Sequence, residues 1–163
     1  MIAIMARRYS RFFPVLLLFF LVPLRAQEEF LKIETQILPR IIMQGEEGTL
    51  KIKITPKSGI KISSNPEFLI KFEENDNFSF PKIFFSGSEL NFPTTQEKEG
   101  VILDLQKEIE IPFKVMETAL IGKQTISGEI TFTALFQDNW CIKTTQKFAS
   151  GFTSRRNYKL KKK

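Results

Sequence analysis

Apolar and polar residues alternate with a period of two along most of the chain beyond residue 30. Successive side chains of a β-strand point to opposite faces of its sheet, so this period predicts strands with one buried face. No segment shows the 3.6-residue period and capping residues of a helix. Short strands at this spacing predict an all-β fold, an immunoglobulin-like antiparallel β-sandwich. The apolar positions that share one parity are Leu31, Ile33 and Ile37; Leu50, Ile52 and Ile54; Phe68, Ile70 and Phe72; a long run over residues 101–115; and a run over residues 126–136.

Residues 128–148 have the pattern of a β-hairpin. One strand precedes a polar turn at residues 137–139, and a second strand follows the turn. Leu135 breaks the alternation of the first strand, because it places a large apolar side chain on the otherwise polar face. Trp140 and Cys141, the single tryptophan and the single cysteine of the chain, stand side by side after the turn. We therefore expect any function to lie at this end of the hairpin.

Residues 1–26 have the pattern of a secretory signal peptide. Three arginines precede an apolar run over residues 12–24, and Ala26 offers a small residue before a cleavage point. The run is shorter than the roughly 20 residues that a membrane-spanning helix requires. An uncleaved signal anchor is the alternative. We predict that the mature chain begins at Gln27 and is periplasmic or otherwise exported.

The positive charge of the sequence lies at its two ends. Residues 1–26 hold four of the 24 basic residues and residues 155–163 hold six, so residues 27–152 carry 14 basic against 18 acidic groups. A net negative domain gives no reason to expect a nucleic acid as partner. We predict one sandwich domain over residues 27–152 and a basic, disordered tail over residues 153–163 that folding does not need. Weak contact of this tail with an anionic membrane surface is the livelier alternative.

The residue types that are missing exclude most kinds of catalytic chemistry. The chain has no histidine, which removes His-based triads, His acid–base catalysis and the commonest metal ligand. A single cysteine excludes CxxC redox chemistry and an internal disulfide. The acidic pairs at residues 28–29, 46–47 and 73–74 lie at strand ends or turns, where we interpret them as solvated charges. We expect no metal and no cofactor, and the sequence favours a protein that is not an enzyme.

Trp140 and Cys141 each allow two interpretations. A tryptophan beside a turn commonly closes one end of a sandwich core, but it can also form a binding surface. A lone cysteine is more often a small buried side chain than a reactive thiol. Reactivity of Cys141 would require exposure and a positive neighbour such as Lys143. Taken alone, the residue types favour the buried role for both.

The order of these features resembles a known family. The mature chain is similar to the amino-terminal periplasmic domain of the thiol:disulfide interchange reductase DsbD and to the related disulphide bond corrector domains. This resemblance covers most of residues 29–150 and implies an immunoglobulin-like fold and a place in the periplasmic thiol–disulfide system. The matching stretches are residues 48–54 (GTLKIKI), 59–66 (GIKISSNP), 109–115 and 128–148.

Several residues depart from the family pattern. Cys141 fits the second cysteine of the family's pair, and counting back through the hairpin turn places the first cysteine at Leu135. The region that corresponds to the family's cap loop, residues 95–100 (TQEKEG), has no aromatic residue. Lys143 and two threonines replace a proline-containing segment. One thiol cannot cycle between dithiol and disulfide within a domain, so the resemblance implies the fold without the family's electron transfer.

Two functions remain open from the sequence. In the first, the domain is a protein-binding or accessory module of the thiol–disulfide system, with Trp140, Leu135 and Asp138 at its binding surface. In the second, Cys141 exchanges disulfides with a partner through mixed disulfides. The resemblance implies a protein partner such as a membrane thiol–disulfide reductase or a periplasmic thioredoxin-like protein. The first function is favoured, because exchange within one domain needs a second thiol.

Overall fold

The structure is a computed structural model that describes residues 29–98, 100–137 and 140–159. Over these residues the chain forms strands and no α-helix, as the alternation predicts. The predicted signal peptide, Asp138 and the last four residues lie outside the described residues. The strands are β1 (Leu31–Leu38), β2 (Ile41–Met43), β3 (Glu47–Pro56), β4 (Ile60–Ser63), β5 (Leu69–Phe72), β6 (Phe78–Ser79), β7 (Phe84–Ser86), β8 (Thr94–Glu97), β9 (Gly100–Leu103), β10 (Ile109–Val115), β11 (Gly122–Phe136) and β12 (Cys141–Arg155).

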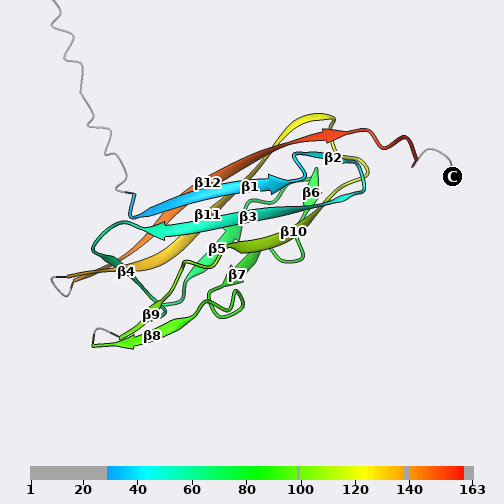
Figure 1. The fold of residues 1–163 in the computed structure, drawn as a ribbon. Coiled ribbons are helices and arrows are strands. Elements are labelled where there is room, and N and C mark those ends of the chain that lie inside the picture. The colour runs from blue at the N-terminus through cyan, green and yellow to red at the C-terminus, as the bar shows by residue number, and fades with distance from the viewer. Residues whose placement is uncertain (1–28, 99, 138–139, 160–163) are drawn as a thin grey trace, which may run out of the picture.

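The strands form two sheets whose order is that of an immunoglobulin-like β-sandwich (Figure 1). The smaller sheet has the order β1-β3-β10-β6, which corresponds to strands A, B, E and D of an immunoglobulin domain. In the larger sheet β12 and β11 correspond to strands G and F, and β4 and β5 share the position of strand C beside β11. Strands β7, β8 and β9 extend this sheet beyond the C position. The predicted fold class is therefore confirmed.

The first strand changes sheets at Pro39. Strand β1 pairs with β3 in the smaller sheet, and β2 then joins the larger sheet beside β12. The β2–β12 pairing is parallel, which is an exception to the antiparallel arrangement that the sequence predicted. Ile42 on β2 is fully buried, whereas Ile41 and Met43 on either side of it are exposed.

The core lies between the two sheets and consists of the side chains that the alternation placed on one parity. Strands β3 and β10 contribute from the smaller sheet, and β4, β5 and β11 contribute from the larger one. On β11 the even-numbered side chains from Ile126 to Ala134 are buried, as predicted. Phenylalanines fill the remaining space. Phe113 and Phe152, from opposite sheets, have ring centroids 5.4 Å apart. The chain thus buries its core without a disulfide.

The long alternation over residues 101–115 belongs to two strands in different sheets. Strand β9 pairs with β4 and β8 in the larger sheet, and after a turn over residues 104–108 strand β10 pairs with β3 in the smaller one. The single parity expected for this run is wrong at its start, since Val101 is exposed and Ile102 is buried. Two sheets place their buried faces independently, so one parity need not continue through the crossing.

The end of the domain lies further along the chain than predicted. Strand β12 continues to Arg155, with Thr153 to Arg155 paired to β2 on one side and Ser154 paired to Gly122 of β11 on the other. Ser154 is fully buried. The boundary at residue 152 is therefore wrong, because residues 153–155 belong to β12. Thr153 and Ser154 are polar and show no apolar pattern, so the sequence did not reveal their pairing.

Candidate functional site

The candidate site is the tip of the β11–β12 hairpin, at the end of the sandwich away from Arg155, where β12 ends (Figure 1). The two strands pair continuously from Gly122↔Ser154 to Leu135↔Cys141. At the tip the Phe136 amide donates a hydrogen bond to the Trp140 carbonyl oxygen, 3.1 Å away. The predicted strand–turn–strand is confirmed.

Leu135 and Cys141 lie directly opposite each other. In an antiparallel ladder, hydrogen-bonded and non-hydrogen-bonded pairs alternate. The next pair, Phe136 and Trp140, is of the hydrogen-bonded type, because the Phe136 amide donates to the Trp140 carbonyl oxygen. Leu135 and Cys141 therefore form a non-hydrogen-bonded pair, the type with Cα atoms about 4.5 Å apart. Thr131 and Thr145 form another pair of this type, and their hydroxyl oxygens are 3.0 Å apart. The expected position of residue 135 opposite Cys141 is confirmed. Its origin as a lost cysteine stays a prediction.

Cys141 is exposed and forms no disulfide. The interpretation of this residue as a small buried side chain is therefore wrong. Odd-numbered residues of β11 and β12 point away from the core, and Cys141 begins its strand at the tip of the hairpin. Lys143 lies two residues further along the same outer face and is also exposed. The exposure and the positive neighbour that a reactive thiol would require are both present.

Trp140 packs on the edge of the core and is also half exposed. Its ring stacks on that of Phe136, with centroids 4.1 Å apart and planes inclined by 7°. Phe136 in turn contacts Phe30 edge to face at 5.5 Å, which connects the stack to the start of β1. Even so, 49% of Trp140 is exposed, and Ile142 on the same face of the hairpin is 37% exposed. The indole is held in place by the edge of the core and still presents apolar surface to solvent.

On the other side of Leu135 lies Lys61 of β4, so Cys141, Leu135 and Lys61 form one row across three strands. The Lys61 ammonium forms an ion pair with the Glu97 carboxylate at the end of β8. The β8–β9 hairpin contains the region of the expected cap loop, and it lies next to β4 in the same sheet. This hairpin flanks the outer face of the tip with charged and polar side chains.

Of the predicted site residues, the structure brings Leu135, Trp140 and Cys141 together at the tip, and Asp138 lies outside the described residues. Sequence analysis missed Phe136 and Lys61. Phe136 could have been found, because it stands opposite Trp140 once the turn is counted. Lys61 could not, because its position depends on the pairing of β4 with β11, more than 70 residues later. We name Leu135, Phe136, Trp140, Cys141 and Ile142 the tip surface.

No protein-family model matches this chain, and no curated protein matches it. Solved structures that resemble part of it include the major pilin subunit BcpA of Bacillus cereus, at 9% identity and a TM-score of 0.43. That alignment covers 79% of this chain and 41% of the pilin. Murine CRIg aligns at 7% identity and a TM-score of 0.32, covering 79% of this chain and 99% of CRIg. A conjugate transposon protein from Bacteroides vulgatus aligns at 11% identity and a TM-score of 0.26, over 77% and 89% of the two chains. This chain spans less than half of the pilin, and the fold assignment rests on its own strand order.

The part of the chain that the structure describes contains no group of acidic and cysteine side chains arranged to hold a metal ion. Within the same residues, no helix has the length and apolarity needed to cross a membrane.

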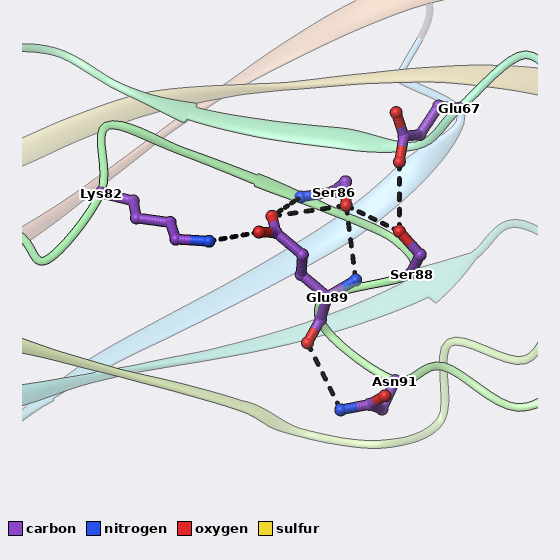
Figure 2. Close-up of polar contacts among 6 residues, drawn as sticks. All are labelled: Glu67, Lys82, Ser86, Ser88, Glu89 and Asn91. Carbon is purple, nitrogen blue, oxygen red and sulfur yellow. Dashed lines mark hydrogen bonds and ion pairs between the residues drawn. The ribbon is translucent and has the colours of Figure 1, made fainter.

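A second polar cluster, after β7, stabilises a turn (Figure 2). The Ser86 amide donates to Glu89 Oε2 at 3.0 Å, and the Glu89 amide donates to Ser86 Oγ at 3.3 Å. This reciprocal bonding is that of a helix capping box, here closing a turn without a helix. The hydrogen bond from Lys82, followed by that from the Ser86 amide, lowers the pKa of Glu89. Ser88 also donates to Glu67 at 3.3 Å. The cluster therefore fixes the connection between β7 and β8.

Replacing Leu135 with cysteine should produce a disulfide with Cys141 in air. The two residues form a non-hydrogen-bonded pair, and a bridge requires Cα atoms within about 7 Å. The bridge should appear as the loss of two hydrogens in the mass and of both thiols in alkylation. It should stabilise the fold by about 2 kcal/mol, because it restricts the unfolded chain. The gain is modest, because the loop that it closes is short.

Thr133→Cys is the matched control for this bridge. Residue 133 lies on the same face, but its direct partner is Lys143, so its Cα atom is about 7–8 Å from that of Cys141. Thr133 is buried, and its hydroxyl has no hydrogen-bond partner among the described residues, so a thiol there should be tolerated. A folded Leu135→Cys variant that keeps two alkylatable thiols, or an equally fast bridge in the control, would show that the register at the tip is wrong.

Proposed function

We propose that this chain is an exported sandwich module that binds a protein partner of a thiol–disulfide system through the tip surface. The observation that carries the proposal is the half-exposed Trp140, stacked on Phe136 and adjacent to the exposed Cys141. Tryptophan is enriched among the residues that dominate binding energy, and a ring already held in place loses little entropy on binding. The assignment to a thiol–disulfide system rests on the family resemblance.

The geometry also limits how a partner can bind. Trp140 and Cys141 are consecutive, so their side chains point to opposite faces of the hairpin. Trp140 lies on the side of Phe136, and Cys141 lies on the side of Leu135. A partner that contacts both must therefore cover the end of the hairpin rather than one face of the sheet.

Trp140→Ala should weaken binding of the partner by about thirtyfold, which is the loss expected for a tryptophan at the centre of an interface. The measurement is recovery of a protein with a redox-active cysteine pair from envelope extract on the immobilised chain. The control is Phe84→Ala, since Phe84 is an equally exposed aromatic residue on β7, away from the tip. Equal recovery by the two variants would refute the tip surface as the binding site.

The alternative function is disulfide exchange by Cys141. The exposure of this residue supports it, because a partner disulfide could reach the thiol. In that reaction the Cys141 thiolate attacks one sulfur of a partner disulfide, forming a mixed disulfide and releasing the partner's other thiolate. A different thiolate of the partner then attacks the mixed disulfide and releases the Cys141 thiolate, so the partner's disulfide moves to a new pair of cysteines and this chain is neither oxidised nor reduced overall. Cys141→Ser separates the two functions. If the chain is an accessory module, the variant still binds its partner. If it is an exchange protein, the variant no longer forms the mixed-disulfide complex that acid quenching and alkylation trap with the parent chain.

A further inference from the structure

The end of the sandwich opposite the tip surface carries a second exposed surface, formed by three segments. These are residues 40–43 on and before β2, residues 116–121 between β10 and β11, and residues 155–159 after β12. We name it the basic end. The β11–β12 ladder runs from Leu135↔Cys141 at the tip to Gly122↔Ser154 at the basic end, a distance of about 45 Å for extended strands. Figure 1 shows the end of β12 here, far from the hairpin tip.

Large apolar side chains are exposed at the basic end. Leu120, Ile121 and Tyr158 are 69%, 53% and 74% exposed. Met43, Ile121 and Tyr158 line one hollow of about 530 Å³ together with Arg155, Arg156 and Lys159. Ile41 and Met116 add further exposed apolar surface from the neighbouring segments. Single exposed apolar residues are ordinary, but a group of them at one end of a domain marks an interaction surface.

Hydrogen bonds hold the three segments in place, so this exposure does not come from a loose loop. Gln44 Nε2 donates to the Ala119 carbonyl oxygen at 2.7 Å, which ties the 116–121 segment to the turn after β2. The Leu120 amide donates to Asn77 Oδ1 at 2.7 Å. Asn157 Nδ2 donates to the Gln44 carbonyl oxygen at 3.2 Å, which ties the last segment to the same turn. The apolar side chains are thus presented on a braced frame.

The charge at the basic end is distributed unevenly. The three segments contain four basic residues, Arg40, Arg155, Arg156 and Lys159, against Glu117 alone. Acidic residues adjoin the other sides: Glu46 precedes β3, Glu47 begins it, and Asp76 precedes Asn77, which accepts the hydrogen bond from Leu120. The cationic side of the surface is therefore the one formed by residues 155–159. In the sequence the chain then continues with Leu160 and three lysines.

We propose that the basic end docks on the headgroup region of an anionic lipid bilayer. Leu120 and Ile121 enter the interface, Tyr158 lies at the headgroup level, and Arg155, Arg156 and Lys159 contact lipid phosphates. Protruding apolar side chains beside basic ones are the features that bind proteins to such interfaces, and each basic residue near an anionic surface adds to the affinity. This inference is independent of the function proposed for the tip surface.

The test is sedimentation of the chain with vesicles. The sandwich and its core lie within residues 29–159, so the chain starting at Gln27 is used, and the apolar run over residues 12–24 cannot contribute. It should sediment with phosphatidylglycerol–phosphatidylcholine vesicles, much less with pure phosphatidylcholine, and less as salt is added. Replacing Arg155, Arg156 and Lys159 with glutamine should weaken binding about a hundredfold, and Leu120→Ser with Ile121→Ser about tenfold or more.

Matched variants distinguish this surface from a general effect of charge or hydrophobicity. One control variant has Lys57, Lys71 and Lys107 all replaced with glutamine, which removes the same charge elsewhere on the domain. A second control, with Ile83→Ser and Phe84→Ser, removes exposed apolar side chains from another surface. Both controls should bind like the parent chain apart from a small effect of net charge. If the control variants lose as much vesicle binding as the test variants, the proposal is overturned. It is also overturned if the chain shows no preference for anionic vesicles, and a protein would then be the partner of the basic end.

The single tryptophan supplies a second readout. Trp140 is at the far end of the ladder, so its emission should stay unchanged when the basic end binds vesicles. A blue shift on binding would mean that the tip enters the membrane instead, and it would refute the orientation proposed here.

Discussion

Replacing Gly128 with alanine should destabilise the sandwich by about 2–3 kcal/mol, the upper part of the range for overpacking a dense core. Gly128 lies on β11 between Phe72 of β5 and Phe148 of β12. A Cβ atom there would be 2.6 Å from Phe148 Cζ and 2.7 Å from the Lys71 carbonyl oxygen. The phenylalanine ring can turn aside, but the carbonyl belongs to a paired strand and can move only if β5 separates from β11. The measurement is urea unfolding, in which the midpoint should fall with little change in the denaturant slope.

Gly151→Ala is the control for this substitution. Gly151 lies on β12 opposite Thr125, and the nearest atom to a new Cβ would be the Gln124 carbonyl oxygen at 3.8 Å, an ordinary contact. Alanine there removes backbone freedom from the unfolded chain and should leave stability unchanged within about 1 kcal/mol. If both variants unfold at the same denaturant concentration, the close approach of β5 to β11 at Gly128 is not as described.

The sequence predicted those parts of the fold that depend on neighbouring residues. The alternation on β3 and β11 identified Leu50, Ile52, Ile130 and Phe132 as core, because each strand buries one face. The polar turn predicted the last hairpin, and the cysteine spacing of the family that the chain resembles placed the first cysteine at Leu135, which lies opposite Cys141. Local spacing thus predicted the fold class, and the resemblance supplied the position opposite Cys141.

Features that depend on distant segments could not be predicted in this way. Nothing in the local sequence states that β1 and β2 lie in different sheets, or that the run over residues 101–115 divides between two. The exposure of Cys141 depends on what covers the outer face of the tip, and residue type alone favoured burial. Lys61 entered the site through pairing with a strand far along the chain. The last residues of β12 are polar, and they are ordered by β2 rather than by an apolar pattern of their own.

The two proposed surfaces place constraints on each other. A chain docked on a bilayer through Leu120 and Tyr158 would hold the tip surface about 45 Å from the headgroups, given the length of the β11–β12 ladder. Trp140 and Cys141 would then face away from the membrane. A partner that is itself a membrane protein would have to extend a domain by that distance to reach them, whereas a partner free in the surrounding compartment would not.

Ending the chain at Phe152 should destabilise the fold by about 3–5 kcal/mol, because it removes residues 153–155, the part of β12 that pairs with β2. The Thr153 amide donates to the Arg40 carbonyl oxygen at 2.9 Å, and the Gln44 amide donates to the Arg155 carbonyl oxygen at 2.8 Å. Both bonds are lost, and Ile42, which is fully buried, loses the pairing that holds it over the core. The new terminal carboxylate also lies on Phe152, a core residue that contacts Phe113.

A chain that ends at Asn157 is the matched control, because it keeps β12 and the hydrogen bond from Asn157 to Gln44. The described residues that it lacks, Tyr158 and Lys159, are exposed. Its thermal midpoint should therefore stay close to that of the chain starting at Gln27. The midpoint of the chain ending at Phe152 should fall by about 10 °C or more, because each kcal/mol lowers the midpoint by about 3 °C or more in a domain of this size. Equal midpoints would mean that the last residues of β12 contribute nothing to the sandwich, and the domain would then end at residue 152 as its sequence pattern indicates. A large loss in the control as well would instead assign the stabilisation to the residues after Asn157, and the parallel β2–β12 pairing would no longer account for it.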